Sequence, residues 1–275
     1  KNLDLLGQVD RLVVQAARQS DDKLMLVNWL LLYGNRLRLG NELSAAVSAL
    51  QEADLMASQH CDASVQIQTA FLLAAAYYSQ GRYADANTTY EHCLRLAREM
   101  QDVEKELQIL PELGTTQLRV NHVAEAETTL VDCLNRAEEQ QQQGVKARTL
   151  CKLARLYLKH KGDTVAPEKA LRYLEEAYRI FASLDDQAGT AETLGLLGDA
   201  SRYKKDTANA YEYYRKAREI ERCLGLRAQE AISVGQMAFL ARDCGNYREA
   251  LRLSEESLGL SERLGNDIGK QIQMV

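Results

Sequence analysis

The sequence has little proline and few large aromatic residues: its 275 residues include two prolines, three phenylalanines and one tryptophan. Because proline interrupts the interior of a helix, this scarcity favours long helices. No apolar run approaches the roughly 20 residues that a membrane-spanning helix needs. The formal net charge of −5 argues against a general nucleic-acid-binding protein. What is left is an ordinary globular composition, with 46% hydrophobic and 27% charged residues.

The sequence also lacks the common motifs of catalysis and of cofactor binding. It contains no phosphate-binding loop, no dinucleotide-binding glycine motif and no nucleophile elbow. The four histidines lie far apart, without the spacing of a metal site: His60, His92, His122 and His160. We therefore expect no catalytic residue, no cofactor and no metal ion, and we predict that the protein is not an enzyme.

The six cysteines show no pattern of disulfides. Cys93 and Cys133 fall on apolar helix faces, where a free thiol packs as a small hydrophobic group. The others are scattered and form no CxxC pair: Cys61, Cys151, Cys223 and Cys244. This distribution favours a reducing compartment and a cytoplasmic, intracellular location. Lys1 opens the sequence without a signal-peptide pattern, and we interpret the chain as a piece of a longer protein.

The strongest positive feature is an internal repeat of about 40 residues. Small residues, each preceded by a large one, recur at steps of 40, 40, 40, 44 and 40: Gly34, Ala74, Gly114, Ala154, Gly198 and Ala238. A second series runs in phase with the first: Ala46, Ala86, Ala126, Ala170, Ala210 and Ala250. Apolar residues four and seven positions after most members of the second series complete a stripe along one helix face.

Short turn-forming stretches separate the two series, for example around Gly81, Asn121 and Gly245. Each repeat is therefore predicted to be a helix, a tight turn and a second helix. The small residue of the first helix lets the second helix approach closely, and a Tyr or Leu fills the gap beside it. The longer step places four extra residues in Lys159–Pro167, with Pro167 in the first turn of the following helix. A tolerated insertion is the favoured interpretation, and a recognition loop is the alternative.

This pattern resembles the tetratricopeptide repeat, which reads W-x2-L-G-x2-Y, then A, then A-x3-F-x2-A. In the second copy the matching residues are Ala70, Leu73, Ala74 and Tyr77, followed by Ala86, Tyr90 and Cys93. No copy carries the Trp at its expected place, the closing Pro is absent, and the period is 40 rather than 34. This variant is similar to Pins-type spindle-orientation adaptors, kinesin light chains, Rap-type peptide receptors and the sensor arms of signalling ATPases.

The resemblance implies an all-α fold, a right-handed α-solenoid of helix-turn-helix repeats whose first helices line a concave groove. We expect one array over residues 1–275, in which residues 3–19 form the second helix of a preceding repeat. Six repeats then follow at about 24–62, 63–102, 103–142, 143–185, 186–225 and 226–265, and residues 266–275 begin a further one. Neither end shows the polar capping helix that solenoids normally carry, in keeping with a piece of a longer protein.

The expected groove positions carry seven basic and three acidic residues, in contrast to the acidic chain as a whole. Arginine can bind carboxylates through two parallel hydrogen bonds, asparagine can pair with an extended backbone, and aromatic rings act as anchors. A groove of this composition favours a peptide or protein segment with acidic side chains. The candidate partner-binding residues are Asn28, Asn35, Arg38, Phe71, Tyr78, Arg119, Arg148, Arg155, Lys159, Arg202, Tyr203, Phe239 and Arg242. The alternative is that these arginines are only solvated, or pair with Glu192, Asp199 and Asp243 across neighbouring helices.

The leading functional hypothesis is therefore a non-catalytic scaffold or adaptor that binds a protein partner in the groove, without a membrane or a nucleic acid. The second hypothesis is a sensor or regulatory arm of a multidomain signalling ATPase or transcription regulator. In that case the array also contacts other domains of its own chain. RNA binding by a helical repeat is a further alternative, and the net acidity of the chain counts against it.

Overall fold

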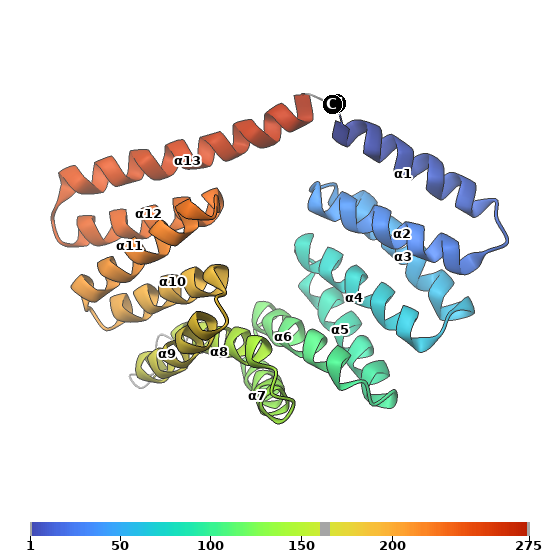
Figure 1. Ribbon diagram of the computed structural model, residues 1–275, viewed down its shortest axis with the longest axis horizontal. Helices are drawn as coiled ribbons and strands as arrows, with labels where there is room; N and C mark the ends of the chain where they lie inside the picture. The colour runs from blue at the N-terminus through green and yellow to red at the C-terminus, as the bar shows by residue number, and fades with distance from the viewer. Residues whose placement is uncertain (1, 160–165, 274–275) are drawn as a thin grey trace. The chain divides into compact units, whose positions relative to one another are not determined.

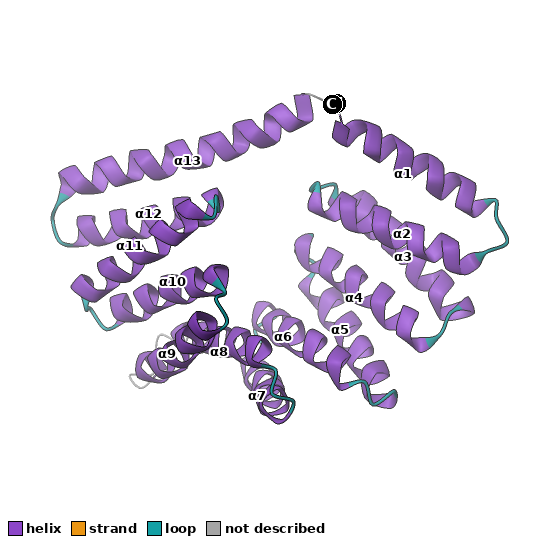
Figure 2. Cartoon of the chain, in the orientation of Figure 1, coloured by secondary structure: helices purple, strands orange, loops and turns teal. Residues whose placement is uncertain are grey.

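The computed structural model describes residues 2–159 and 166–273, and these residues form helices joined by short turns (Figure 1, Figure 2). No strand occurs within these two ranges, in agreement with the all-α prediction. The helices are α1 (Asn2–Arg18), α2 (Lys23–Leu39), α3 (Leu43–His60), α4 (Ala63–Ser79), α5 (Tyr83–Glu99), α6 (Val103–Arg119), α7 (Val123–Glu139), α8 (Gln143–Lys159), α9 (Ala166–Ser183), α10 (Gln187–Tyr203), α11 (Thr207–Cys223), α12 (Arg227–Asp243) and α13 (Tyr247–Gln273).

Nine of the described turns between helices contain one residue in the left-handed conformation. Between α2 and α3 this residue is Asn41, with a φ of 64°. The N–H of Glu42 donates a hydrogen bond to the carbonyl of Leu37 at 2.8 Å, which gives the last turn of α2 the partners that a helix end otherwise lacks. The predicted turns at Gly81, Asn121 and Gly245 have the same positive φ and are confirmed.

Close approach of the two helices within a pair depends on glycine at three positions. A Cβ atom on Gly34 would lie 2.6 Å from Leu50 Cγ, and a Cβ atom on Gly198 would lie 2.5 Å from Tyr214 Cε1. Gly114 is similarly placed against Leu130, at 2.7 Å. In each pair the large residue comes from the second series of the sequence repeat. The predicted fit of a small residue against a Leu or Tyr is therefore confirmed.

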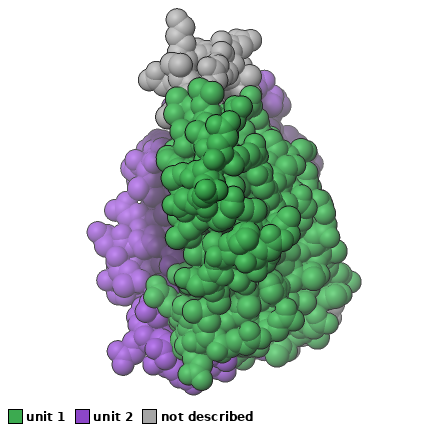
Figure 3. Space-filling view, turned by 90° about the vertical axis from the view of Figure 1, so that its right-hand side faces the viewer, with its two compact units in different colours: residues 1–133, 275 green, residues 134–274 purple. Residues whose placement is uncertain are grey.

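The helices group into two compact units, one extending to Cys133 and the other starting at Leu134 (Figure 3). In the first unit Leu50, Leu73 and Tyr90 are buried. In the second unit one cluster is built around Leu150, Leu174 and Phe181, and another lies between α11, α12 and α13. The core of each unit thus consists of the faces that the two sequence series predicted.

Ion pairs join successive helix pairs at equivalent positions of the repeat. In the first unit Arg98 on α5 lies 3.4 Å from buried Glu106 on α6 and 2.9 Å from Asp132 on α7. In the second unit Lys146 on α8 lies 2.8 Å from Glu138 on α7 and 2.6 Å from Glu176 on α9. Each group of three residues forms an ion-pair triad over three successive helices. The middle helix of the first triad, α6, supplies an acid, and the middle helix of the second triad, α8, supplies a base.

Two expectations about the chain's organisation differ from the structure or lie outside it. The structure continues α13 without a break from Tyr247 to Gln273, whereas a new first helix was expected over 266–275. A helix continues on local hydrogen bonds alone, while a turn is stabilised only when the next helix packs back onto the previous one. Most of the insertion Lys159–Pro167 lies outside the described residues, although Pro167 does fall in the first turn of α9. A single array over the whole chain stays a prediction.

Within the described residues, no helix is both long enough and apolar enough to cross a bilayer.

Candidate functional site

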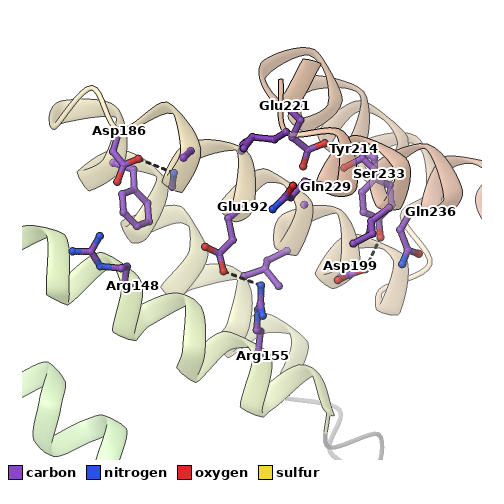
Figure 4. Close-up of a pocket in the computed structure, with 18 residues that line it drawn as sticks. Arg148, Arg155, Asp186, Glu192, Asp199, Tyr214, Glu221, Gln229, Ser233 and Gln236 are labelled. Carbon is purple, nitrogen blue, oxygen red and sulfur yellow. Dashed lines mark hydrogen bonds and ion pairs between the residues drawn. The ribbon is translucent and has the colours of Figure 1, made fainter. Parts of the chain in front are cut away.

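The second unit contains a pocket with a cavity volume of about 570 Å³ on the side of its first helices (Figure 4). Residues of α8, α10 and α12 form its walls, and residues of the second helices α9 and α11 form its floor. The polar residues that line it are Arg148, Arg155, Asp186, Glu192, Asp199, Tyr214, Glu221, Gln229, Ser233 and Gln236. A volume of this size is typical of a ligand site.

Two of the predicted arginines lie in this pocket, with different surroundings. Arg155 donates a hydrogen bond of 2.8 Å to Glu192 on α10, so its charge is already compensated. Both side chains are about half exposed, so such a pair contributes at most about 1 kcal/mol to stability. Arg148 lines the same pocket and has no ion-pair partner among the residues that the structure describes. Asp186 caps the start of α10 by accepting a hydrogen bond from the Gly189 N–H at 2.8 Å.

The middle of the pocket is fixed by a buried tyrosine. Tyr214 on α11 donates its hydroxyl proton to Asp199 on α10 at 2.7 Å. Burial and the neighbouring Asp199 carboxylate raise the pKa of Tyr214, so the phenol stays neutral and remains a donor. Arg202 lies 3.8 Å from Asp199, and its guanidinium stands over the ring of Tyr203 with 5.2 Å between the two centres. Arg202 and Tyr203 thus form a contact pair on α10.

The floor of the pocket also contains a buried acid, Glu221 on α11. Its side chain forms a hydrogen bond with Ser233 on α12, while its Oε2 atom has no hydrogen-bond partner. Burial raises the pKa of Glu221; the hydrogen bond from Ser233 acts in the opposite direction, and the nearby carboxylate of Glu230 raises the pKa further. The lining as a whole therefore has four carboxyl groups and two guanidinium groups.

The other predicted residues of the second unit lie outside this pocket. Phe239 on α12 is half exposed, and Arg242 stacks over its ring at 5.1 Å. Arg242 also lies 3.0 Å from Asp243. Lys159 is exposed at the last position of α8. The predicted alternative, pairing across neighbouring helices, is thus present for Arg155 with Glu192, whereas Arg202 and Arg242 pair with Asp199 and Asp243 within their own helices.

In the first unit the predicted residues form three local contacts. Arg38 donates to the amide oxygen of Asn35 at 2.9 Å, within α2. Phe71 packs edge-to-face on Tyr90, with 5.5 Å between ring centres. Arg119 on α6 donates to the Tyr78 hydroxyl at 3.0 Å and stands over the rings of Tyr78 and Tyr83. Asn28 is exposed on α2. The Phe71 and Arg119 contacts bridge neighbouring helices, and together the three contacts leave little free charge for a ligand in this unit.

Some of the first-helix positions that were expected to face the groove are buried. One such position is buried in three of the helices, where it holds Leu31, Pro111 and Cys151. The pocket instead takes lining residues from a neighbouring α12 position, such as Ser233, and from the second helix α11, which supplies Glu221. A signal for Glu221 was present in the sequence: it is a charged residue at a second-helix position that is apolar in the four preceding repeats.

Comparison with known proteins supports the repeat assignment. Two sequence profiles described as tetratricopeptide repeat match residues 69–104 and 191–226. No curated protein sequence matches the chain. Among solved structures, a Rap protein in complex with competence and sporulation factor is 14% identical with a TM-score of 0.74, and the match covers 97% of this chain and 74% of the Rap protein.

Two further solved structures have a similar fold. BtubC (BKLC) from P. vanneervenii is 21% identical with a TM-score of 0.69, and the match covers 82% of this chain and 93% of BtubC. A signal transduction ATPase with numerous domains from Pyrococcus horikoshii, which has a tetratricopeptide repeat sensor, is 15% identical with a TM-score of 0.71. That match covers 94% of this chain and 40% of the ATPase. At these identities the likeness concerns the fold.

The repeat pattern, the paired helices and the two profile matches lead to one assignment. The chain contains tetratricopeptide repeats, matched at residues 69–104 and 191–226, within an all-α helical repeat fold.

Proposed function

We propose that the protein is a non-catalytic adaptor that binds a segment of a partner protein along the exposed faces of its first helices. The observation that carries this proposal is the pocket of the second unit, in which first helices α8, α10 and α12 present polar side chains around a cavity of about 570 Å³. The Rap protein in the comparison is bound to competence and sporulation factor, which supports a ligand on this type of fold.

The thirteen candidate residues named from the sequence remain our proposed contact residues, with Arg148 and Arg155 as the principal pair. Arg148 is the guanidinium in the pocket that has no ion-pair partner among the described residues, so it is the one best placed to bind an acidic side chain of the partner. Arg155, Arg202 and Arg242 are each already paired with an acidic residue of this protein. An acidic side chain of the partner would have to displace that residue in order to bind. The acidic preference of the partner is therefore proposed for the Arg148 end of the pocket.

The test is a selection of random-sequence peptides displayed on phage, followed by measurement of the selected peptides against charge-reversed variants. Arg148→Glu combined with Arg155→Glu is expected to weaken the selected peptides by at least about tenfold, equivalent to about 1.4 kcal/mol. The matched control is Arg172→Glu combined with Arg179→Glu, because this pair has the same spacing on the neighbouring second helix α9. Equal affinity for the two double variants, or a selection that yields no peptide, would contradict the proposal.

A sensor or regulatory arm of a multidomain signalling ATPase or transcription regulator is a second candidate function. This candidate is favoured by the structural similarity to the ATPase with a tetratricopeptide repeat sensor. The match covers 40% of the length of that ATPase. The sequence of the complete gene product tests it, since a nucleotide-binding or effector domain on the same chain is expected.

A cytoplasmic, reducing location is part of the same proposal. Cys93 and Cys133 are buried thiols, as expected for thiols that serve as small hydrophobic side chains. Localisation of the tagged full-length protein by microscopy tests this part.

A further inference from the structure

The pocket contains a buried carboxylate that the rest of the protein does not fully satisfy. Glu221 is 5% exposed and lines the cavity, and its Oε2 atom has no hydrogen-bond partner. Figure 4 shows the carboxylate on the α12 side of the pocket, near Gln229 and Ser233. A buried carboxylate oxygen without a partner costs free energy, and native structures seldom keep one without a reason.

The fold itself does not require a charge at this position. The equivalent residues of the four preceding repeats are apolar and buried: Ala57, Ala97, Ala137 and Phe181. Each packs inside its repeat at the same point of the second helix. An acid at this point in the fifth repeat therefore lowers the stability of the unbound fold relative to an apolar residue, and a role outside folding explains its presence.

No cation of the described part of the protein compensates Glu221. Arg155 is paired with Glu192, and Arg148 lies at the α8 side of the pocket, apart from Glu221 (Figure 4). Arg218, about one turn earlier on α11, is bound to Glu256 and lies 3.7 Å from Glu230. The Glu221 carboxyl group experiences the negative charge of Glu230 and accepts a hydrogen bond from Ser233, and it would gain from a positive charge supplied by a ligand.

The walls next to Glu221 suit the shape of a long basic side chain. Leu226 and Ile232 line the pocket beside the acid, and Ile232 is largely exposed. Lysine and arginine bury their methylene stems along apolar surface while the charged head reaches a polar partner. The Gln229 and Ser233 side chains stand where such a head can form further hydrogen bonds.

We infer that this pocket binds the side chain of a lysine or an arginine in the partner segment, with Glu221 as its counter-ion. This inference rests on the proposed function, because it names the chemistry of the partner segment at the same pocket. The partner is then bipolar: an acidic residue meets Arg148 at the α8 side, and a basic residue meets Glu221 between α10 and α12.

The test uses the same phage-displayed peptides, selected in parallel on the wild-type protein, on Glu221→Gln and on Glu219→Gln. Glu219 is an exposed acid two residues away on α11, so its variant has the same change of charge outside the pocket. We expect wild type and Glu219→Gln to enrich peptides with a basic residue at one fixed position. Replacing that residue by norleucine should weaken binding to wild type by at least about tenfold and leave binding to Glu221→Gln unchanged. Thermal unfolding checks that each variant is folded.

The outcomes separate this inference from the proposed function. In one outcome, the selected peptides lose affinity for the Arg148→Glu and Arg155→Glu double variant, but they have no preferred basic residue, or they keep that preference when selected on Glu221→Gln. This outcome would overturn the cation pocket and leave the adaptor proposal standing. A selection that yields no peptide on any variant would overturn both.

Discussion

The contact between Gly198 and Tyr214 makes the sharpest prediction about stability. A Cβ atom at Gly198 would lie 2.5 Å from Tyr214 Cε1 and 2.7 Å from Cδ1. Since carbon atoms pack at about 3.5–4.0 Å, the ring would have to retreat by about 1 Å. The ring is 1% exposed and its hydroxyl is bound to Asp199, so it has little room to move. We expect Gly198→Ala to incur an overpacking cost of about 1–3 kcal/mol.

Part of that cost is offset, because alanine is a better helix former than glycine by about 0.5–1 kcal/mol. The net loss in the free energy of unfolding is then up to about 2.5 kcal/mol. Gly195→Ala is the matched control: it lies one turn earlier on α10, and a Cβ there would meet no atom within 4 Å. It should stabilise the protein by about 0.5–1 kcal/mol. Denaturant titration followed by circular dichroism measures both variants. The packing argument is refuted if Gly198→Ala is as stable as Gly195→Ala.

Three further predictions concern other buried groups. Because burial raises the pKa of Glu221 above its unfolded value, the folded state holds that proton more tightly; the free energy of unfolding therefore falls as pH rises through the raised pKa. Glu221→Gln should remove this fall in stability and be more stable than wild type at neutral pH. Denaturant titrations across the acidic to neutral range measure this effect. A variant whose stability depends on pH as that of wild type does would contradict the prediction. The Cys93 thiol is buried and its pKa is raised to about 12, so a thiol reagent should modify exposed Cys223 quickly and Cys93 only on unfolding, as mass spectrometry of the modified peptides would show. Leu174→Ala should lower the free energy of unfolding by about 2–5 kcal/mol, because Leu174 is fully buried in the core of the second unit, and a loss below 1 kcal/mol in a denaturant titration would show that the core there is loose.

The pairing of helices could be predicted from the sequence because it depends on a repeated local fit. Gly198 and Tyr214 belong to two series that keep a fixed offset in every repeat, so the contact follows once both are on helices. The turns at Gly81 and Gly245 followed from the same regularity. These features repeat, and repetition gives the sequence analysis independent copies of the same evidence.

The choice between solvated and paired arginines could not be made from the sequence in the same way. Arg155 and Glu192 lie in different repeats, and their 2.8 Å contact depends on the distance between first helices, which no sequence period fixes. Glu221 was missed for another reason: groove residues were sought on first helices, whereas the pocket floor is formed by a second helix. The unbroken course of α13 through residue 266 was missed because the sequence pattern there continues the repeat.

The reversal of charge between the two ion-pair triads has a consequence for chimeric proteins built from these repeats. If the α8 and α9 pair were grafted directly behind α5, Lys146 would take the place of Glu106 and meet Arg98, so that two cations would face each other at a largely buried junction. The apolar surfaces would still match, since the helix spacing is shared. Neighbouring repeats of this protein are therefore matched to each other by the sign of a single side chain, and exchanging them requires that this side chain be exchanged as well.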